Sequence, residues 1–103
     1  MGTRLPVTDA LLSDEALCII ETRSRSLRFR APVGAAIHME FEDFPHIALW
    51  SRPPAPFLCI EAWTGHGDPE GFSGDIREKP SMRFLPVGIQ ATHAVHLRYE
   101  SPE

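Results

Sequence analysis

Short runs of alternating apolar and polar residues, separated by Pro- and Gly-rich breaks, make up most of this chain. In "SLRFRA" (residues 26–31), Leu27 and Phe29 fall on one side of an extended strand and two arginines on the other. "AAIHMEFE" (residues 35–42) alternates in the same way. A period of two is typical of half-buried β-strands, and 10 Pro and 7 Gly supply many turns. The pattern therefore predicts an all-β fold of mostly antiparallel strands with long loops.

Other segments extend this interpretation. We expect further strands at residues 16–21, 44–51, 57–63, 82–88 and 91–100. "TDALLSDEAL" (residues 8–17) carries the one helix signal, a single turn that Thr8 or Asp9 could cap. Residues 64–81 are too polar and Gly-rich for regular structure. Loops of this length are often binding loops, and this one directly follows a predicted strand.

Composition narrows the class of protein. The 103 residues are enough for a single domain spanning residues 1–103, with 43% apolar and 23% charged residues as in ordinary globular proteins. The net charge of −4 gives no reason to expect nucleic acid or an anionic membrane as a partner. No apolar run approaches the roughly 20 residues that span a bilayer. We see no secretion signal and expect a cytoplasmic protein, in which Cys18 and Cys59 are buried thiols without a disulfide.

One carboxylate stands out in an apolar strand. In "PFLCIEAW" (residues 56–63), alternation places Glu61 and Trp63 on one face and Ile60 and Ala62 on the other. An unpaired acid in an apolar setting costs stability. Either Glu61 points to solvent on a half-exposed strand, or it belongs to a site. An aromatic ring next to a carboxylate suits a sugar, since the ring offers a flat apolar surface and the carboxylate accepts hydrogen bonds from hydroxyls.

The same stretch carries a family resemblance. "FPHIALWSRPPAPFLCIEAWTGHGDPEGFSGD" resembles the C-terminal part of the aldose 1-epimerase (galactose mutarotase-like) family, whose signature reads roughly W-[ST]-x-P-x-A-P-F-[IVL]-C-I-E-P-W-x-G-x-x-D. The matching positions are Trp50, Ser51, Pro53, Ala55, Pro56, Phe57, Cys59, Ile60, Glu61, Trp63, Gly65 and Asp68. The resemblance continues through "EKPSMRFLPVG" and covers about residues 5–99. Ala62 departs from it, since the family usually has proline there.

The resemblance implies a fold and a chemistry. Family members are β-supersandwiches about two to three times this length, so this chain would be a partial one. The glutamate matching Glu61 is the general base that takes a proton from the anomeric hydroxyl of a hexose, while a histidine protonates the ring oxygen. The ring opens, C1–C2 rotates, and closure gives the other anomer without a metal or organic cofactor. Trp63, Trp50 and Arg52 would then line the sugar site, and His66, in the long loop beside Glu61, could reach the ligand.

The part of the family that carries the acid histidine has no counterpart here. None of the five histidines matches its motif, so we assign none a catalytic role: His38, His46, His66, His93 and His96. Asp9 matches a sugar-contacting position only loosely and is otherwise a turn cap. Half a sandwich would leave sheet edges and an apolar inner face uncovered. We therefore expect the chain to be marginally stable, to self-associate, or to pair with a missing N-terminal half.

Two other motifs carry less weight. The basic run at residues 23–30 could bind the phosphate of a sugar phosphate, although a solvated strand is the more economical interpretation. "HGDPEG" and "SGD" lack the ordered ligand spacing of a calcium loop, so no metal site is expected. Three functions remain open: an aldose 1-epimerase-type isomerase with Glu61 as base, a carbohydrate-binding β-sandwich module without turnover, and a structural remnant.

Overall fold

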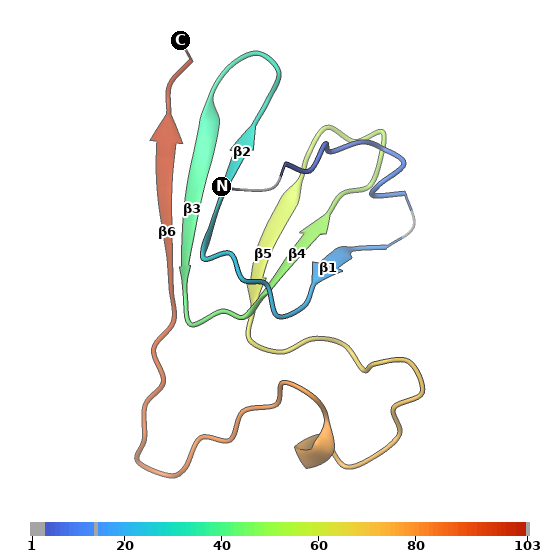
Figure 1. Ribbon diagram of the computed structural model, residues 1–103, viewed down its shortest axis with the longest axis vertical. Coiled ribbons are helices and arrows are strands. Elements are labelled where there is room, and N and C mark those ends of the chain that lie inside the picture. Colours follow the sequence, from blue (N-terminus) through green and yellow to red (C-terminus); the bar gives the residue numbers. More distant parts are fainter. Residues whose placement is uncertain (1–3, 14, 103) are drawn as a thin grey trace.

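The protein is described by a computed structural model that covers residues 4–13 and 15–102 (Figure 1). These residues form six strands and one short 3-10 helix. The strands are β1 (Leu17–Ile19), β2 (Ser26–Arg30), β3 (Ala36–Glu42), β4 (His46–Trp50), β5 (Cys59–Trp63) and β6 (Ala94–Glu100), and the 3-10 helix η1 spans Ile76–Glu78.

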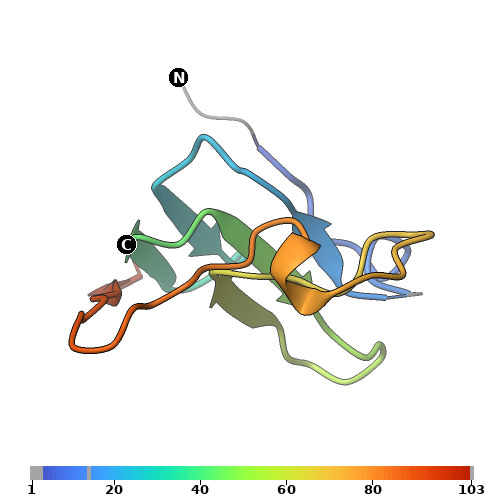
Figure 2. The same ribbon diagram turned by 90° about the horizontal axis from the view of Figure 1, so that it is seen from below.

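The strands pair into two antiparallel sheets of three strands each. One sheet has the order β1-β4-β5 and the other β2-β3-β6. The chain crosses from the first sheet to the second after β1, returns after β3, and crosses again through residues 64–93, which run past the lower ends of both sheets in Figure 1 and across them in Figure 2. The expected all-β architecture of antiparallel strands with long loops is confirmed.

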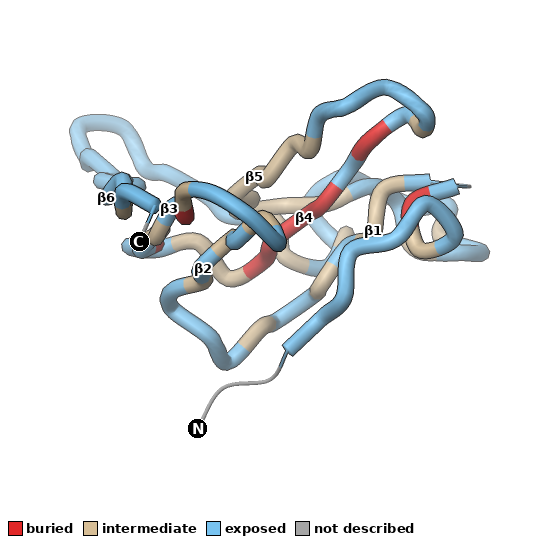
Figure 3. The backbone as a smooth tube through the Cα atoms, turned by 90° about the horizontal axis from the view of Figure 1, so that it is seen from above, coloured by how far each residue is buried: buried red, intermediate tan, exposed pale blue. Residues whose placement is uncertain are grey.

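The alternation seen in the sequence decides which faces meet. Residues directly opposite each other in an antiparallel pair share a face, so Ile47 and Leu49 of β4 lie with Ile60 and Ala62 of β5. These side chains pack against Phe41 of the other sheet. The buried cluster at the centre consists of Leu12, Phe41, Ile47 and Leu49. Burial is concentrated along β4, as Figure 3 shows.

The N-terminal turn closes one side of this core. The Thr8 hydroxyl accepts the Leu11 N–H at 3.2 Å, and the Leu12 N–H donates to the Asp9 carbonyl at 3.2 Å. Thr8 is therefore the residue that caps the turn, through its hydrogen bond to Leu11. The turn delivers Leu12, only 5% exposed, into the core. Asp14, which follows in the same predicted segment, lies outside the described residues.

Two sequence predictions are wrong. Residues 82–88 do not form a strand: Pro86 offers no N–H for a ladder, Gly88 turns the chain with a φ of 84°, and no described strand lies beside the segment. Cys18 is exposed rather than buried, because it points to the outer side of the short edge strand β1. Cys59 is half-buried, and both thiols are free.

The first two crossovers between the sheets, β1–β2 and β3–β4, lie against each other. The Thr22 N–H donates to the Pro45 carbonyl at 2.9 Å, and each crossover contains a residue in the left-handed region, Glu21 with a φ of 53° and Asp43 with a φ of 62°. The Asp43 carboxylate receives the Arg83 guanidinium, with Nη1 and Oδ2 2.9 Å apart. This hydrogen bond holds the pKa of Asp43 below its ordinary value. The later part of the long connection is thereby fixed to the β3–β4 crossover.

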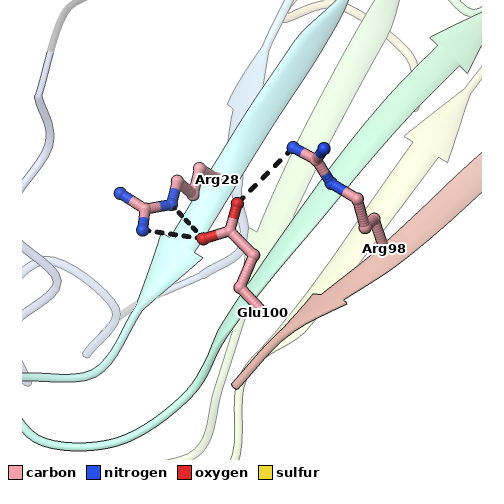
Figure 4. Close-up of polar contacts among 3 residues, drawn as sticks. All are labelled: Arg28, Arg98 and Glu100. Atoms are coloured by element: carbon pink, nitrogen blue, oxygen red, sulfur yellow. Dashed lines mark hydrogen bonds and ion pairs between the residues drawn. The ribbon is translucent and has the colours of Figure 1, made fainter. Parts of the chain in front are cut away.

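The outward side of the second sheet is polar. Arg28 on β2 and Arg98 on β6 both contact the Glu100 carboxylate, at 2.7 Å and 3.5 Å (Figure 4). These residues alternate with the apolar ones that face the first sheet, as the sequence predicts.

The chain exposes more surface than its size requires. A compact protein of 11.5 kDa would expose about 5,800 Å², whereas this one exposes 8255 Å². Its radius of gyration is 16.1 Å, against about 13 Å for a compact domain of this length. The long connection, residues 64–93, contributes much of this surface, since most of its residues are exposed.

Candidate functional site

Glu61 lies on the face of the first sheet that points away from the core. The β4–β5 register pairs His46 with Trp63, Ala48 with Glu61, and Trp50 with Cys59, so these side chains share that face. We call it the outer face of the β1-β4-β5 sheet; it also carries Cys18, which opposes Ala48. The alternation predicted for residues 57–63 is observed.

The Glu61 carboxylate is held by its aromatic neighbour. The Trp63 indole donates from Nε1 to Glu61 Oε1 at 3.2 Å, and both side chains are half-buried. Trp50 lies diagonally across from Glu61, a relationship that separates Cα atoms by about 7–8 Å in antiparallel strands. Glu61 therefore sits between two indoles on one face, with Ala48 opposite it on β4. This arrangement gives a hydrogen-bond acceptor flanked by flat apolar surfaces.

A shallow, open depression begins where β5 ends. It measures about 500 Å³ and is lined by Phe44, Ala62, Trp63, Thr64, Gly65, His66 and Gly67. Glu61 does not line it, but the Trp63 indole lines the depression and binds the Glu61 carboxylate. The Trp63 side chain is thus the contact between the depression and the Glu61 carboxylate.

His66 is oriented by its own loop. Its Nδ1 lies 2.8 Å from the Gly67 carbonyl, which can only accept, so Nδ1 carries a proton in this contact. The ring meets that of His46 edge to face, with centroids 5.1 Å apart. His66 is half-buried and lines the depression next to Trp63, so it is the histidine placed to contact a molecule bound there.

His46 is a structural residue. It is 1% exposed, and its Nδ1 accepts the Glu21 backbone N–H at 2.9 Å. Nδ1 is therefore unprotonated, and the neutral ring carries its proton on Nε2, which lies 2.9 Å from Ser81 Oγ. Burial, and next the nearby His66, lower the pKa of His46. Because Nε2 donates to Ser81, His46 does not act as a base toward that hydroxyl.

The remaining predicted site residues gather at the opposite end of the hairpin. Trp50 stacks on Phe57 with ring centroids 5.5 Å apart. Asp9 and Phe57 help line a second depression of about 260 Å³. Arg52 is exposed and lines neither depression. The six predicted residues are therefore divided: Trp63 and His66 lie at one end of the hairpin, Trp50 and Arg52 at the other, and Glu61 between them. Asp9 lines the second depression together with the core residue Leu12.

Ser51, which belongs to the motif of residues 50–68, stabilises the turn between β4 and β5. Its hydroxyl donates to the Phe57 carbonyl at 2.6 Å, and the Ala55 N–H donates to the Arg52 carbonyl at 2.9 Å. These bonds close the Pro-rich turn between β4 and β5, which contains a cis Pro53–Pro54 peptide. The turn fixes the hairpin register and thereby the face on which Glu61 lies.

Two residues in and near the depression were not predicted from the sequence. Phe44 enters from the β3–β4 crossover, and Ser81 reaches His46 across the end of the sheet. The sequence signal for a buried polar contact was His46 itself, a histidine in a strand whose other residues are mostly apolar. A half-polar ring in that position needs partners for both nitrogens.

No group of three or more potential metal ligands is found among residues 4–13 and 15–102. Within the same residues no helix is long and apolar enough to cross a membrane. Comparison of the chain with protein-family models, with curated proteins and with solved structures finds no match.

Proposed function

We propose that this chain binds a hexose at the outer face of the β1-β4-β5 sheet and acts on it in the manner of an aldose 1-epimerase, with Glu61 as the general base. The observation that carries the proposal is the Glu61 carboxylate held at 3.2 Å by the Trp63 indole, beside a depression lined by aromatic side chains. The motif around residues 50–68 supports the same assignment.

The site suits the polarity of a sugar ring. A hexose presents an apolar C–H face and an edge of hydroxyl groups. The C–H face would stack on Trp63, and the anomeric hydroxyl would donate to the free oxygen of Glu61. His66, which also lines the depression, would contact another hydroxyl. Trp50 would supply a second apolar surface for a longer ligand.

The proposed reaction needs a base and an acid. Glu61 removes the anomeric hydroxyl proton as the C1–O5 bond breaks, and an acid gives a proton to O5, which leaves the open-chain aldehyde. After rotation about C1–C2, the reverse proton transfers close the ring to the other anomer, so atoms and charge balance. His46 cannot serve as the acid, since it is buried and bound at both nitrogens. His66 or a bound water would have to supply the proton.

We also propose that the two antiparallel sheets are a partial β-supersandwich of the galactose mutarotase type. The uncovered inner surface supports this, because a complementary half would cover it. If such a half is present, it would bring the acid in place of His66 or a bound water.

The second candidate function is a carbohydrate-binding module without turnover. It is favoured by one observation: Glu61 has an indole N–H beside it rather than an acidic group. Such a module would need only the stacking surface and the acceptor.

Polarimetry distinguishes these functions. Freshly dissolved α-D-glucose or α-D-galactose should equilibrate faster with the protein than without it, and Glu61→Gln should lose the acceleration by on the order of 100-fold. Glu70→Gln, which changes an exposed carboxylate in the neighbouring loop, serves as the control. No acceleration together with saturable NMR shifts of the Trp63 and His66 signals would establish the binding module. No acceleration and no shifts would refute both functions.

A further inference from the structure

The inner face of the β2-β3-β6 sheet continues beyond the part that the other sheet covers. Phe41 is 3% exposed and belongs to the core, whereas its neighbours toward β6 are open. Val95 is 42% exposed, and Leu97 and Tyr99 are each 68% exposed. Register places Val95 opposite Phe41 and Leu97 opposite Met39, so these three β6 side chains extend the apolar core outward.

β6 is also an edge strand. It follows β3 in the order β2-β3-β6, and no described strand pairs with its other side. Figure 1 shows it as the outermost strand, and Figure 3 shows it largely exposed. An edge strand with a free row of N–H and C=O groups and an apolar face is a template for another strand. Its seven residues contain no proline that would block pairing.

We propose that β6 pairs antiparallel with β6 of a second copy of this chain, which would join the two β2-β3-β6 sheets into one continuous sheet across a two-fold axis. Pairing all seven residues, 94–100, places the central residue Leu97 on the axis, opposite Leu97 of the second copy. The same register sets Val95 against Tyr99. The apolar side chains of both copies then form one row on the inner face, and the two-fold symmetry closes the assembly.

Part of the surface that the chain exposes lies on β6. The chain exposes 8255 Å², which exceeds the surface of a compact monomer of its mass by about 2,400 Å². A standard stable interface removes about 800 Å² from each partner. Much of the surplus belongs to the long connection, residues 64–93, most of which is exposed, and β6 contributes the open apolar side chains of Val95, Leu97 and Tyr99.

The charges on the polar side of β6 do not oppose this pairing. Arg98 lies 3.5 Å from Glu100, and His96 lies 3.3 Å from Glu42. Glu100 is further bound by Arg28, at 2.7 Å (Figure 4). Arg98 thus has a carboxylate partner within its own copy, so its charge is compensated where the register sets it opposite His96 of the second copy.

Sedimentation velocity and light scattering at increasing protein concentration test the proposal. The unmodified chain should be a dimer, and Leu97→Lys should be a monomer with an unchanged far-UV circular dichroism spectrum. Ile76→Lys is the matched control, because Ile76 is 64% exposed on η1, away from β6, and should leave the dimer intact. A monomer at every concentration, a ladder of larger oligomers, or a dimer that survives Leu97→Lys would overturn the proposal.

Cross-linking tests the register without relying on a disruptive charge. In a Cys18→Ser, Cys59→Ala background, Leu97→Cys should form a disulfide between copies under mild oxidation. Residues opposite each other in an antiparallel pair have Cα atoms about 4.5–5.5 Å apart, within disulfide range. Ile76→Cys in the same background should stay monomeric under denaturing conditions, and failure of Leu97→Cys to cross-link would refute the register. Glu61→Gln should dimerise normally, so this result is independent of the proposed sugar chemistry.

Discussion

The Arg28 guanidinium reaches across an entire strand to the Glu100 carboxylate, with Nη2 and Oε2 2.7 Å apart. Arg28 lies on β2 and Glu100 on β6, and β3 runs between these strands. Ala36 of β3 opposes Glu100 on the same face, and its short side chain leaves room for the two longer ones to meet above it. The pair therefore ties the outermost strands of the sheet together (Figure 4).

We expect this ion pair to contribute little to stability. Half of the Arg28 side chain is exposed, at 50%, so water screens the attraction. Arg28→Met should lower the free energy of unfolding by about 0.5 kcal/mol, and the loss should shrink in high salt. Urea denaturation measures it, with Arg30→Met as the control on the same face. A salt-independent loss, or an equal loss in the control, would contradict this explanation.

Stability should depend on pH through His46. Its folded pKa lies below the ordinary 6.5, because burial disfavours the charged ring. As pH falls below about 6.5, the unfolded chain takes up a proton at this residue and the folded chain does not, so the free energy of unfolding falls until the pH reaches the folded pKa. Urea midpoints measured from neutral pH downward should show this decline.

The variant His46→Leu isolates that effect. It removes the titrating ring and leaves the Glu21 N–H unpaired, which should cost about 1–3 kcal/mol at neutral pH. The decline attributed to His46 should disappear in this variant and persist in His96→Leu, whose ring lies on the exposed side of β6. An identical pH profile in the protein and in His46→Leu would show that another group is responsible.

Ser81 combines a hydrogen bond with a strained backbone. Its φ is 66°, and its hydroxyl binds His46 at 2.9 Å. Ser81→Ala loses the bond and keeps the strain, whereas Ser81→Gly loses the bond and relieves the strain. The glycine variant should therefore be the more stable of the two, by about 1 kcal/mol. At Ser73, whose φ is not positive, glycine should be no better than alanine, and thermal unfolding of the four variants checks both expectations.

Sugar binding should depend unequally on the two tryptophans. Trp63 lines the larger depression and binds Glu61, whereas Trp50 packs on Phe57 at the other end of the hairpin. Trp63→Leu removes an aromatic contact of about 1 kcal/mol and should weaken hexose binding roughly fivefold. Trp50→Leu should weaken it less, and NMR titration compares them. Equal effects would place the sugar over the whole outer face.

Local periodicity accounts for what the sequence could predict. A strict alternation of apolar and polar residues predicts which side of a strand is buried, and the burial of residues 26–30 follows it. In residues 36–42 the burial departs from the alternation, since Ala36 is 4% and Ile37 41% exposed, and all of residues 59–63 are half-buried. The face that carries Glu61 and Trp63 followed from the same rule. Where the pattern was a mixed run, as in residues 82–88, it could not tell an extended loop from a strand, because strand formation there depends on a partner.

The parts of the site that required long-range contacts were not predictable. The depression combines residues after β5 with Phe44 from the β3–β4 crossover, and only the folded chain brings them together. Trp50 is separated from His66 by the length of the β4–β5 hairpin, and Asp9 lies in the N-terminal turn beside the second depression. Burial of Cys18 was expected from its apolar neighbours, but β1 proved to be a short edge strand with one side open.

The long connection also has a consequence for the order of folding. β2 and β3 are neighbours in the chain, whereas β3 and β6 pair residues about 52 to 64 positions apart. Closing the longer loop costs about 2 kcal/mol more in chain entropy than closing the short hairpin. Docking of β6 should therefore be a late step, and until it occurs β3 stands as a temporary edge able to accept a strand from any neighbouring molecule.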